Sequence, residues 1–168
     1  MTHNGPMGYK ASFLPVLLAV CSAGCHSLAV NEVAAAARSG DTAAISRLAR
    51  SRVDLNAPSG VNRWTPLHHA VHKNRPESVR ALAAAGARVN ERDPNGITAL
   101  MMAAGYGYTE TAAALLDAGA DAKLRDYRGR SARDYATTGV FDIDRITLFR
   151  KQQGVLALLD RRAMAATR

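Results

Sequence analysis

The chain is poor in cysteine and has no long hydrophobic run. Its 168 residues contain two cysteines, Cys21 and Cys25, and both lie in or beside an apolar segment near the N-terminus. This placement excludes an internal disulfide framework and gives a Cys-x-x-x-Cys metal or redox site little support. The apolar segment, Ala11–Gly24, contains Pro15 and is shorter than the roughly 20 residues that a membrane-spanning helix needs.

Sequence motifs for catalysis are missing as well. There is no Gly-x-Ser-x-Gly turn, no glycine-rich phosphate-binding loop and no cysteine paired with a histidine in a catalytic pattern. His68 and His72 share one helix face, but the zinc-protease pattern requires glutamate where His69 stands. Fewer ligands than a zinc site uses are visible nearby. We therefore expect no enzymatic activity, no cofactor and no bound metal.

The N-terminal residues indicate export. Met1–Lys10 is polar with one positive charge and precedes the apolar segment, which is the order of a secretory signal peptide. Ser22-Ala23-Gly24-Cys25 resembles a bacterial lipoprotein cleavage box, although that box favours leucine at the position of Ser22. Cys25 would then carry the lipid, and cleavage after Ala23 or Ala29 is the alternative. We predict a signal peptide over residues 1–24 and a linker over 25–30, in a protein that is periplasmic or anchored to an envelope membrane.

The strongest positive signal is an internal repeat. Thr65, Thr98 and Ser131 are spaced 33 residues apart. The residues around them repeat as well, in the segments Thr65-Pro66-Leu67-His68-His69-Ala70, Thr98-Ala99-Leu100-Met101-Met102-Ala103 and Ser131-Ala132-Arg133-Asp134-Tyr135-Ala136. A fixed period of this length indicates a solenoid, whose units bury their apolar faces only by stacking on one another. Solenoids mostly bind other molecules, so the period itself favours a binding function.

These segments resemble the ankyrin-repeat family. Thr65-Pro66-Leu67-His68 followed by Ala70 matches the family signature, and Gly86-Ala87-Arg88-Val89-Asn90 is similar to its Gly-Ala-Asp-Val-Asn exit. A looser copy begins near Asn31, and the match fades after Thr138. The resemblance implies an all-α solenoid of stacked helix-turn-helix units with short inter-repeat β-turns. It implies about four repeats over residues 31–138, of which the first and last are degenerate.

Two departures from the family pattern and the C-terminal segment complete the fold prediction. Arg63 stands where the family favours glycine, so it is either left-handed at a cost of about 1–2 kcal/mol or relaxed by the extra residue in the Ala57–Arg63 loop. Arg133 replaces a leucine, so its helix is expected to meet solvent. Residues 139–168 are predicted to cap the stack with two helices that Gly154 separates.

In ankyrin repeats the turn tips and the outward side of each first helix form a concave face that binds proteins. We therefore predict a protein-binding surface here, with Trp64 as its main contact because tryptophan is enriched at interface hot spots. The alternative is that Trp64 folds over its own repeat. The predicted contact residues are Arg63, Trp64, His69, His72, Lys73, Ile97, Met102, Tyr106, Tyr127, Arg128, Arg130 and Tyr135.

The charge leaves other functions open. The net charge is +8, and Lys123 to Arg168 holds 11 basic and 5 acidic residues. A basic surface through Arg125–Arg133 that binds anionic lipid headgroups is therefore one alternative, and an accessory chaperone for an envelope enzyme is another. Export argues against nucleic acid. Small exported bacterial ankyrin proteins include some that resemble immunity proteins, which suggests an inhibitor of a secreted effector. An exposed apolar row could also serve a second copy of the chain.

Overall fold

The computed structural model describes residues 31–138 and 145–165, and these form stacked helices. Residues 31–39 are helical, followed by α2 (Thr42–Arg50), α3 (Pro66–His72), α4 (Pro76–Ala84), α5 (Ala99–Tyr106), α6 (Thr109–Asp117), α7 (Ala132–Thr138) and α8 (Arg145–Ala165). The predicted all-α solenoid is confirmed. The predicted signal peptide, the linker with its lipidation site Cys25, and residues 139–144 lie outside the described residues.

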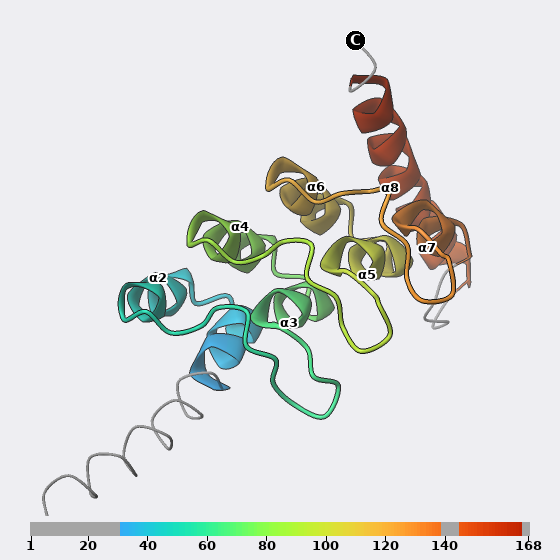
Figure 1. Cartoon of the computed structure of the whole chain (residues 1–168). Helices are drawn as coiled ribbons and strands as arrows, with labels where there is room; N and C mark the ends of the chain where they lie inside the picture. The colour runs from blue at the N-terminus through green and yellow to red at the C-terminus, as the bar shows by residue number, and fades with distance from the viewer. Residues whose placement is uncertain (1–30, 139–144, 166–168) are drawn as a thin grey trace, which may run out of the picture.

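The helices form two layers (Figure 1). One layer contains α3, α5 and α7, and the other contains α2, α4 and α6. Successive helices pack on one another within each layer, and α3 packs on α4 and α5 on α6 between the layers. Helix α8 stands at the end of the stack, where it packs on α5, α6 and α7. The turns that precede α3, α5 and α7 project from the same side of the stack (Figure 1), and we call this side the concave face.

Local sequence signals fix where the helices begin and end. Thr65 caps α3 by accepting a hydrogen bond from the backbone N–H of His68, and Pro66 occupies the first helical position. Gly86 and Gly119 follow α4 and α6 with φ of +91° and +88°. A side chain at such a position strains the backbone, which is why glycine commonly ends a helix there. These ends agree with the sequence analysis.

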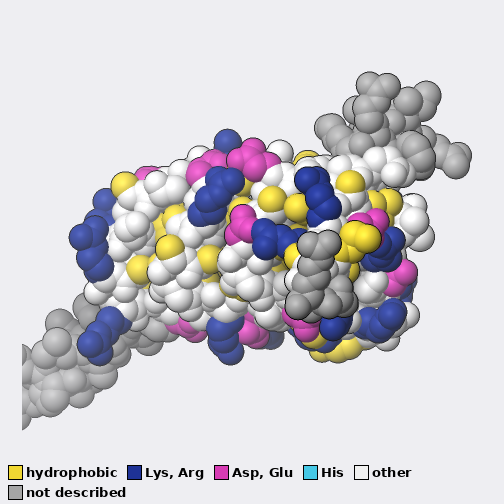
Figure 2. Space-filling model, turned by 90° about the horizontal axis from the view of Figure 1, so that it is seen from above, with side chains coloured by type: hydrophobic (Ala, Val, Ile, Leu, Met, Phe, Trp, Pro, Cys, Tyr) yellow, Lys and Arg dark blue, Asp and Glu magenta, His cyan; other side chains and the backbone are white. Residues whose placement is uncertain are grey.

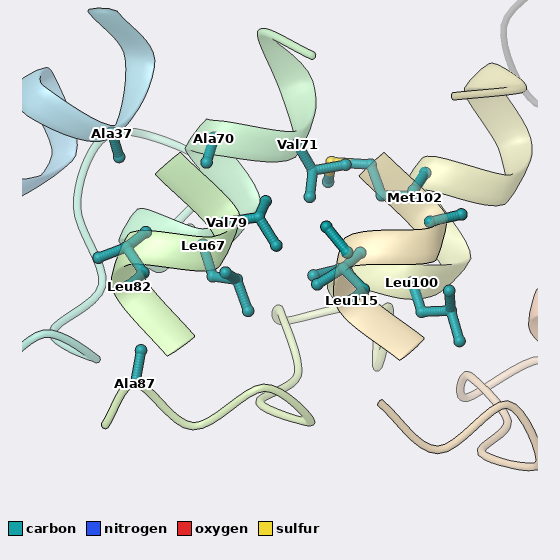
Figure 3. Close-up of a cluster of buried hydrophobic side chains, with 14 of the residues drawn as sticks. Ala37, Leu67, Ala70, Val71, Val79, Leu82, Ala87, Leu100, Met102 and Leu115 are labelled. Carbon is teal, nitrogen blue, oxygen red and sulfur yellow. The ribbon is translucent and has the colours of Figure 1, made fainter. Parts of the chain in front are cut away.

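The core lies between the two layers and consists of small and branched side chains (Figure 3). Leu67 of α3 and Leu82 of α4 point into the same cluster, in which Leu82 and Leu115 have 0 % exposure. Alanines fill the remaining contacts, including Ala70, Ala103, Ala104 and Ala112. Because an alanine side chain is short, the paired helices approach closely and each repeat buries its apolar face on the next.

Each inter-repeat turn closes with one antiparallel bridge. The bridges are Ser59–Trp64 in the first turn, Arg92–Thr98 in the second and Arg125–Ser131 in the third. In the second turn, Asp93 Oδ1 accepts hydrogen bonds from the backbone N–H groups of Asn95 and Ile97, at 2.8 and 2.9 Å. Gly60 occupies the equivalent position of the first turn, which therefore has no such carboxylate.

Arg63 adopts the strained conformation at the tip of the first turn. Its φ is +49°, so the additional loop residue does not relax the turn. We expect Arg63→Gly to raise the free energy of unfolding by about 1 kcal/mol, because the left-handed strain outweighs the entropy that glycine adds to the unfolded chain. Chemical denaturation measures this change. Asn62→Gly, at an exposed neighbour with ordinary φ, is the matched control and should lower stability; equal effects of both variants would show that Arg63 is unstrained.

The C-terminal cap differs from its prediction. It is one continuous helix, α8, and Gly154 lies inside it instead of separating two helices. A Cβ atom at Gly154 would lie 2.6 Å from Oγ1 of Thr109, at the start of α6. Glycine therefore allows α8 to pack closely on α6, which offsets its cost of about 1 kcal/mol inside a helix. Val155 and Leu159 are buried at this contact.

Candidate binding surface

The concave face has a hollow between the first and second turns. Its volume is about 390 Å³. The two turns form its walls, and Met102 of α5 and Tyr135 of α7 line it from the helices. The lining residues are Val61, Asn62, Trp64, Asp93, Pro94, Asn95, Ile97, Met102 and Tyr135. We call this the concave hollow. Residues from three successive repeats therefore meet at one place.

Aromatic rings continue from the concave hollow across two repeats. The ring of Trp64 lies 5.1 Å from that of His72, which lies 5.9 Å from that of Tyr106. Nδ1 of His72 is 3.1 Å from the hydroxyl oxygen of Tyr106, and Tyr106 stacks on Tyr108 at 5.2 Å between ring centroids. We call these four residues the aromatic row. Its mutual contacts hold the rings in fixed positions, which lowers the entropy lost when a ligand binds them.

The structure gives Trp64 two sets of contacts. Its ring packs edge-on to His69 at 5.7 Å and tilted over His72, and both belong to the helix of its own repeat. The same side chain is half-buried and lines the concave hollow. Both interpretations of the sequence therefore have a geometric counterpart: Trp64 covers its own repeat and also offers a face to the hollow. Its contact with a partner stays a prediction.

Three predicted contact residues are buried. His69 is 8 % exposed, Met102 4 % and Tyr135 1 %. Met102 and Tyr135 nevertheless line the concave hollow. The Nε2 atom of His69 is 3.0 Å from Oγ of Ser59. His69 therefore supports the first turn, and its predicted contact with a partner stays a prediction.

The remaining predicted residues do not gather at one place. Ile97 lines the concave hollow, whereas exposed Lys73 caps the C-terminal end of α3. Arg63 borders a separate depression, on the Asn56 side of the first turn. The third turn holds Tyr127, which is 73 % exposed, and Arg128; with Arg130 they line a depression between the second and third turns. The predicted surface therefore divides into the concave hollow and peripheral positions.

A buried carboxylate organises the third turn. Asp126 Oδ2 accepts hydrogen bonds from Nη2 of Arg130 at 2.9 Å and from the hydroxyl of Tyr135 at 2.8 Å, while its Oδ1 accepts two backbone N–H groups. Burial alone would raise the pKa of Asp126, but the hydrogen bonds from the backbone of Arg130, from Tyr135 and from the Arg130 side chain lower it to about 2. The side chain of Arg130 therefore stabilises the third turn through its interaction with Asp126.

Three of the four arginines in the cluster Arg125–Arg133 have carboxylate partners. Arg130 pairs with Asp126, Arg125 lies 3.6 Å from Asp134, and Arg133 pairs with Asp160 of α8. Arg133 is exposed, as predicted from its place where a leucine is usual. A cluster neutralised in this way has a weaker field than its formal charge suggests. The exposed guanidinium groups nevertheless keep N–H donors for an anion bound in direct contact.

Comparison with known proteins decides the family. A model of the family described as ankyrin repeats (3 copies) matches residues 33–126. The chain belongs to the ankyrin-repeat family. It is also similar to protein phosphatase 1 regulatory subunit 27 of Mus musculus, with 37 % identity over 87 residues. That match covers 50 % of this chain and 54 % of the relative, so the chain spans about half the length of the curated relative.

The ankyrin signature histidine joins neighbouring repeats. Nδ1 of His68 is 2.8 Å from Oγ1 of Thr65, and Nε2 is 3.1 Å from the carbonyl oxygen of Ile97 in the next repeat. Because a carbonyl only accepts, Nε2 carries the proton and Nδ1 accepts from the threonine hydroxyl. Burial lowers the pKa of His68 and keeps the ring neutral. Among the described residues no group of three or more His, Cys, Asp or Glu could hold a metal ion.

The histidines make the ankyrin stack sensitive to acid. Burial, joined by the charge of Arg38, lowers the pKa of His69 to about 4, and burial also lowers the pKa of His72. Because the pKa of these histidines is lower in the folded chain than its value near 6.5 in the unfolded chain, protonation favours the unfolded chain. The stability present above pH 6.5 is therefore lost as the pH falls toward 4. We expect the free energy of unfolding to decrease between pH 6.5 and 4. Denaturation at each pH should show a smaller decrease in the free energy of unfolding for His69→Gln than for the wild type. Equal decreases in the two proteins would contradict the contribution of His69 to the acid sensitivity.

Sequence reasoning missed five residues of the concave hollow, namely Val61, Asn62, Asp93, Pro94 and Asn95. Val61 is fully exposed at the tip of the first turn, and Pro94 and Asn95 form the opposite wall. Asp93 holds the second turn in shape through its two hydrogen bonds to backbone N–H groups. The register of the ankyrin repeat was the available signal, because Val61 and Pro94 occupy equivalent turn positions 33 residues apart. The sequence showed these positions as turns but not that the turns enclose a hollow.

No helix in the described ranges is long and apolar enough to cross a bilayer.

Proposed function

We propose that this protein is a non-catalytic binding module whose concave hollow takes an apolar side chain of a partner protein. The observation that carries the proposal is the junction of the hollow with the aromatic row at Trp64. Interface hot spots are enriched in tryptophan and tyrosine and lie in pockets that exclude water. Here Trp64 supplies aromatic surface at a hollow of about 390 Å³, and Tyr106 continues this surface through His72.

The proposed place of action is the cell envelope, outside the cytoplasm. The N-terminal signal pattern and the cleavage box at Cys25 support export and a lipid anchor at that cysteine. In this setting the protein would occupy a functional surface of a secreted or periplasmic effector and inhibit it, as an immunity protein does. The mouse relative is named as a regulatory subunit, which is compatible with action on an enzyme without catalysis.

An accessory chaperone is the second form of the same proposal. It would use the same hollow but raise the activity of its partner enzyme instead of lowering it. The two forms are separated by assaying the captured partner with and without the ankyrin protein. Inhibition supports the immunity form, and activation or protection from aggregation supports the chaperone form.

The test is a pulldown from envelope extract with residues 26–168 as bait. Trp64→Ala combined with Tyr106→Ala should release the partner, because truncation of each hot-spot residue costs about 2 kcal/mol or more. The matched control is Arg80→Ala with Glu110→Ala. It removes an exposed ion pair between α4 and α6 from the layer of α2, α4 and α6, which we call the outer layer. Circular dichroism confirms that both variants fold. A partner retained equally by all three proteins would refute the assignment to the concave hollow.

A further inference from the structure

A second hollow lies at the other end of the stack, where α8 leaves α6 and α7. Its volume is about 460 Å³. Apolar side chains from α6, the following loop and α8 line its interior: Leu116, Ala120, Ala122, Leu159 and Ala163. Known ligand pockets have a comparable size and are mostly apolar with a few polar groups at defined positions. We call it the cap hollow, and it shares no residue with the concave hollow.

The rim of the cap hollow is basic. Lys123, Arg125, Arg133 and Arg162 line it, and Asp121 is the one acidic residue among its lining residues. Figure 2 shows basic and hydrophobic side chains next to one another toward this end of the molecule. An apolar interior with a cationic rim is complementary to a molecule that has an apolar chain and an anionic head.

Arg125 lies 3.6 Å from Asp134, and the other two rim arginines are also held by carboxylates without using all of their N–H donors. Arg133 pairs with Asp160 and Arg162 with Asp117, and neither carboxylate lines the hollow. The arginine side chains remain 55 % and 49 % exposed. A guanidinium group has five N–H donors, so one carboxylate partner leaves donors for a second anion. The ion pairs therefore orient the arginines toward the rim before any ligand arrives.

We propose that the cap hollow binds a single-chain fatty acid, with the alkyl chain in the apolar interior and the carboxylate at the arginines. Burial of each CH₂ group contributes about 0.8 kcal/mol, so two additional CH₂ groups tighten binding by roughly tenfold while the chain still fits. The carboxylate distinguishes the ligand from uncharged chains of equal length. This site would make the protein responsive to free fatty acid independently of its partner on the concave face.

Calorimetric titration of the full chain with decanoate, below its micelle-forming concentration, tests the proposal. Decanoate should bind about tenfold more tightly than octanoate, and decanol and decyltrimethylammonium should bind much more weakly. Ala163→Trp, at an exposed position, fills the hollow and should abolish binding. Arg162→Gln should weaken it about tenfold. Arg80→Gln, which removes an exposed arginine paired with Glu110 outside the hollow, is the matched control and should leave affinity unchanged.

Methyl NMR locates the site. Leu116 and Leu159 should shift on addition of decanoate, while Leu82 should not. The proposal would be overturned if decanoate still bound to Ala163→Trp or if decyltrimethylammonium bound equally well, because the molecule would then adsorb elsewhere. Absence of decanoate binding to the folded wild-type protein would also overturn it. None of these outcomes depends on the partner of the concave hollow, so the two proposals fail separately.

Discussion

Replacing Asp126 with alanine should lower the free energy of unfolding by about 3–4 kcal/mol, because it leaves Arg130 and the hydroxyl of Tyr135 without their buried partner. The equivalent change in the preceding turn, Asp93→Ala, should cost only about 1–2 kcal/mol, because Asp93 accepts two backbone hydrogen bonds and no arginine. The two aspartates occupy the same position of successive repeats, so the difference isolates the network around Asp126.

Urea denaturation of both variants measures this difference, and pH provides a second readout. The folded-state pKa of Asp126 is about 2, below its ordinary value of 3.8. Its contribution is therefore complete above pH 4 and is lost as pH falls toward 2, so wild type and Asp126→Ala should converge in that window. Equal losses from Asp93→Ala and Asp126→Ala would contradict the assigned role of the network.

Gly96→Ala should lower the free energy of unfolding by about 3 kcal/mol, since it adds a steric clash to left-handed strain. Gly96 has a φ of +79°, and a Cβ atom there would lie 2.8 Å from the backbone nitrogen of Tyr127. Because that nitrogen donates to the carbonyl of Asn95 at 3.3 Å, the substitution also separates the second turn from the third.

Gly129→Ala is the matched control for this prediction. Gly129 has the same φ of +79°, but no atom lies within 4 Å of the position its Cβ would take. It should cost only about 1–2 kcal/mol, which is the backbone strain alone. Thermal and chemical denaturation of both variants measure the difference. If Gly129→Ala destabilised as much as Gly96→Ala, the close approach of the two turns would not contribute to stability.

The parts of the fold that depend on local chemistry could be predicted from the sequence. Thr65 and Pro66 begin a helix, and Gly86 ends one, through atoms only a few residues away. Gly154 could not be predicted in the same way. Its role depends on Thr109, 45 residues earlier in the chain, and a glycine in isolation indicates an interruption.

The candidate site, like the fold, could be predicted from the sequence only in part. The repeat register predicted that Trp64 and Ile97 occupy equivalent positions of successive turns, because equivalent residues of a solenoid align. Both residues line the concave hollow, but they lie at the bases of their turns and not at the tips. It could not show that Tyr135 is buried, with its hydroxyl hydrogen-bonded to Asp126 and Arg130. It also could not show that Arg133 meets Asp160 of α8, because that contact depends on how the last helix crosses the stack.

Photocrosslinking in cells tests most directly whether the concave hollow binds a partner protein. A photoreactive amino acid replaces Val61, which is fully exposed at the rim of the hollow, or Ala84, which is exposed at the end of α4 in the outer layer. We expect one crosslinked protein from position 61 and none from position 84, with the product lost when Trp64→Ala and Tyr106→Ala are added. Crosslinks from position 84 alone, or from both positions regardless of these changes, would contradict it.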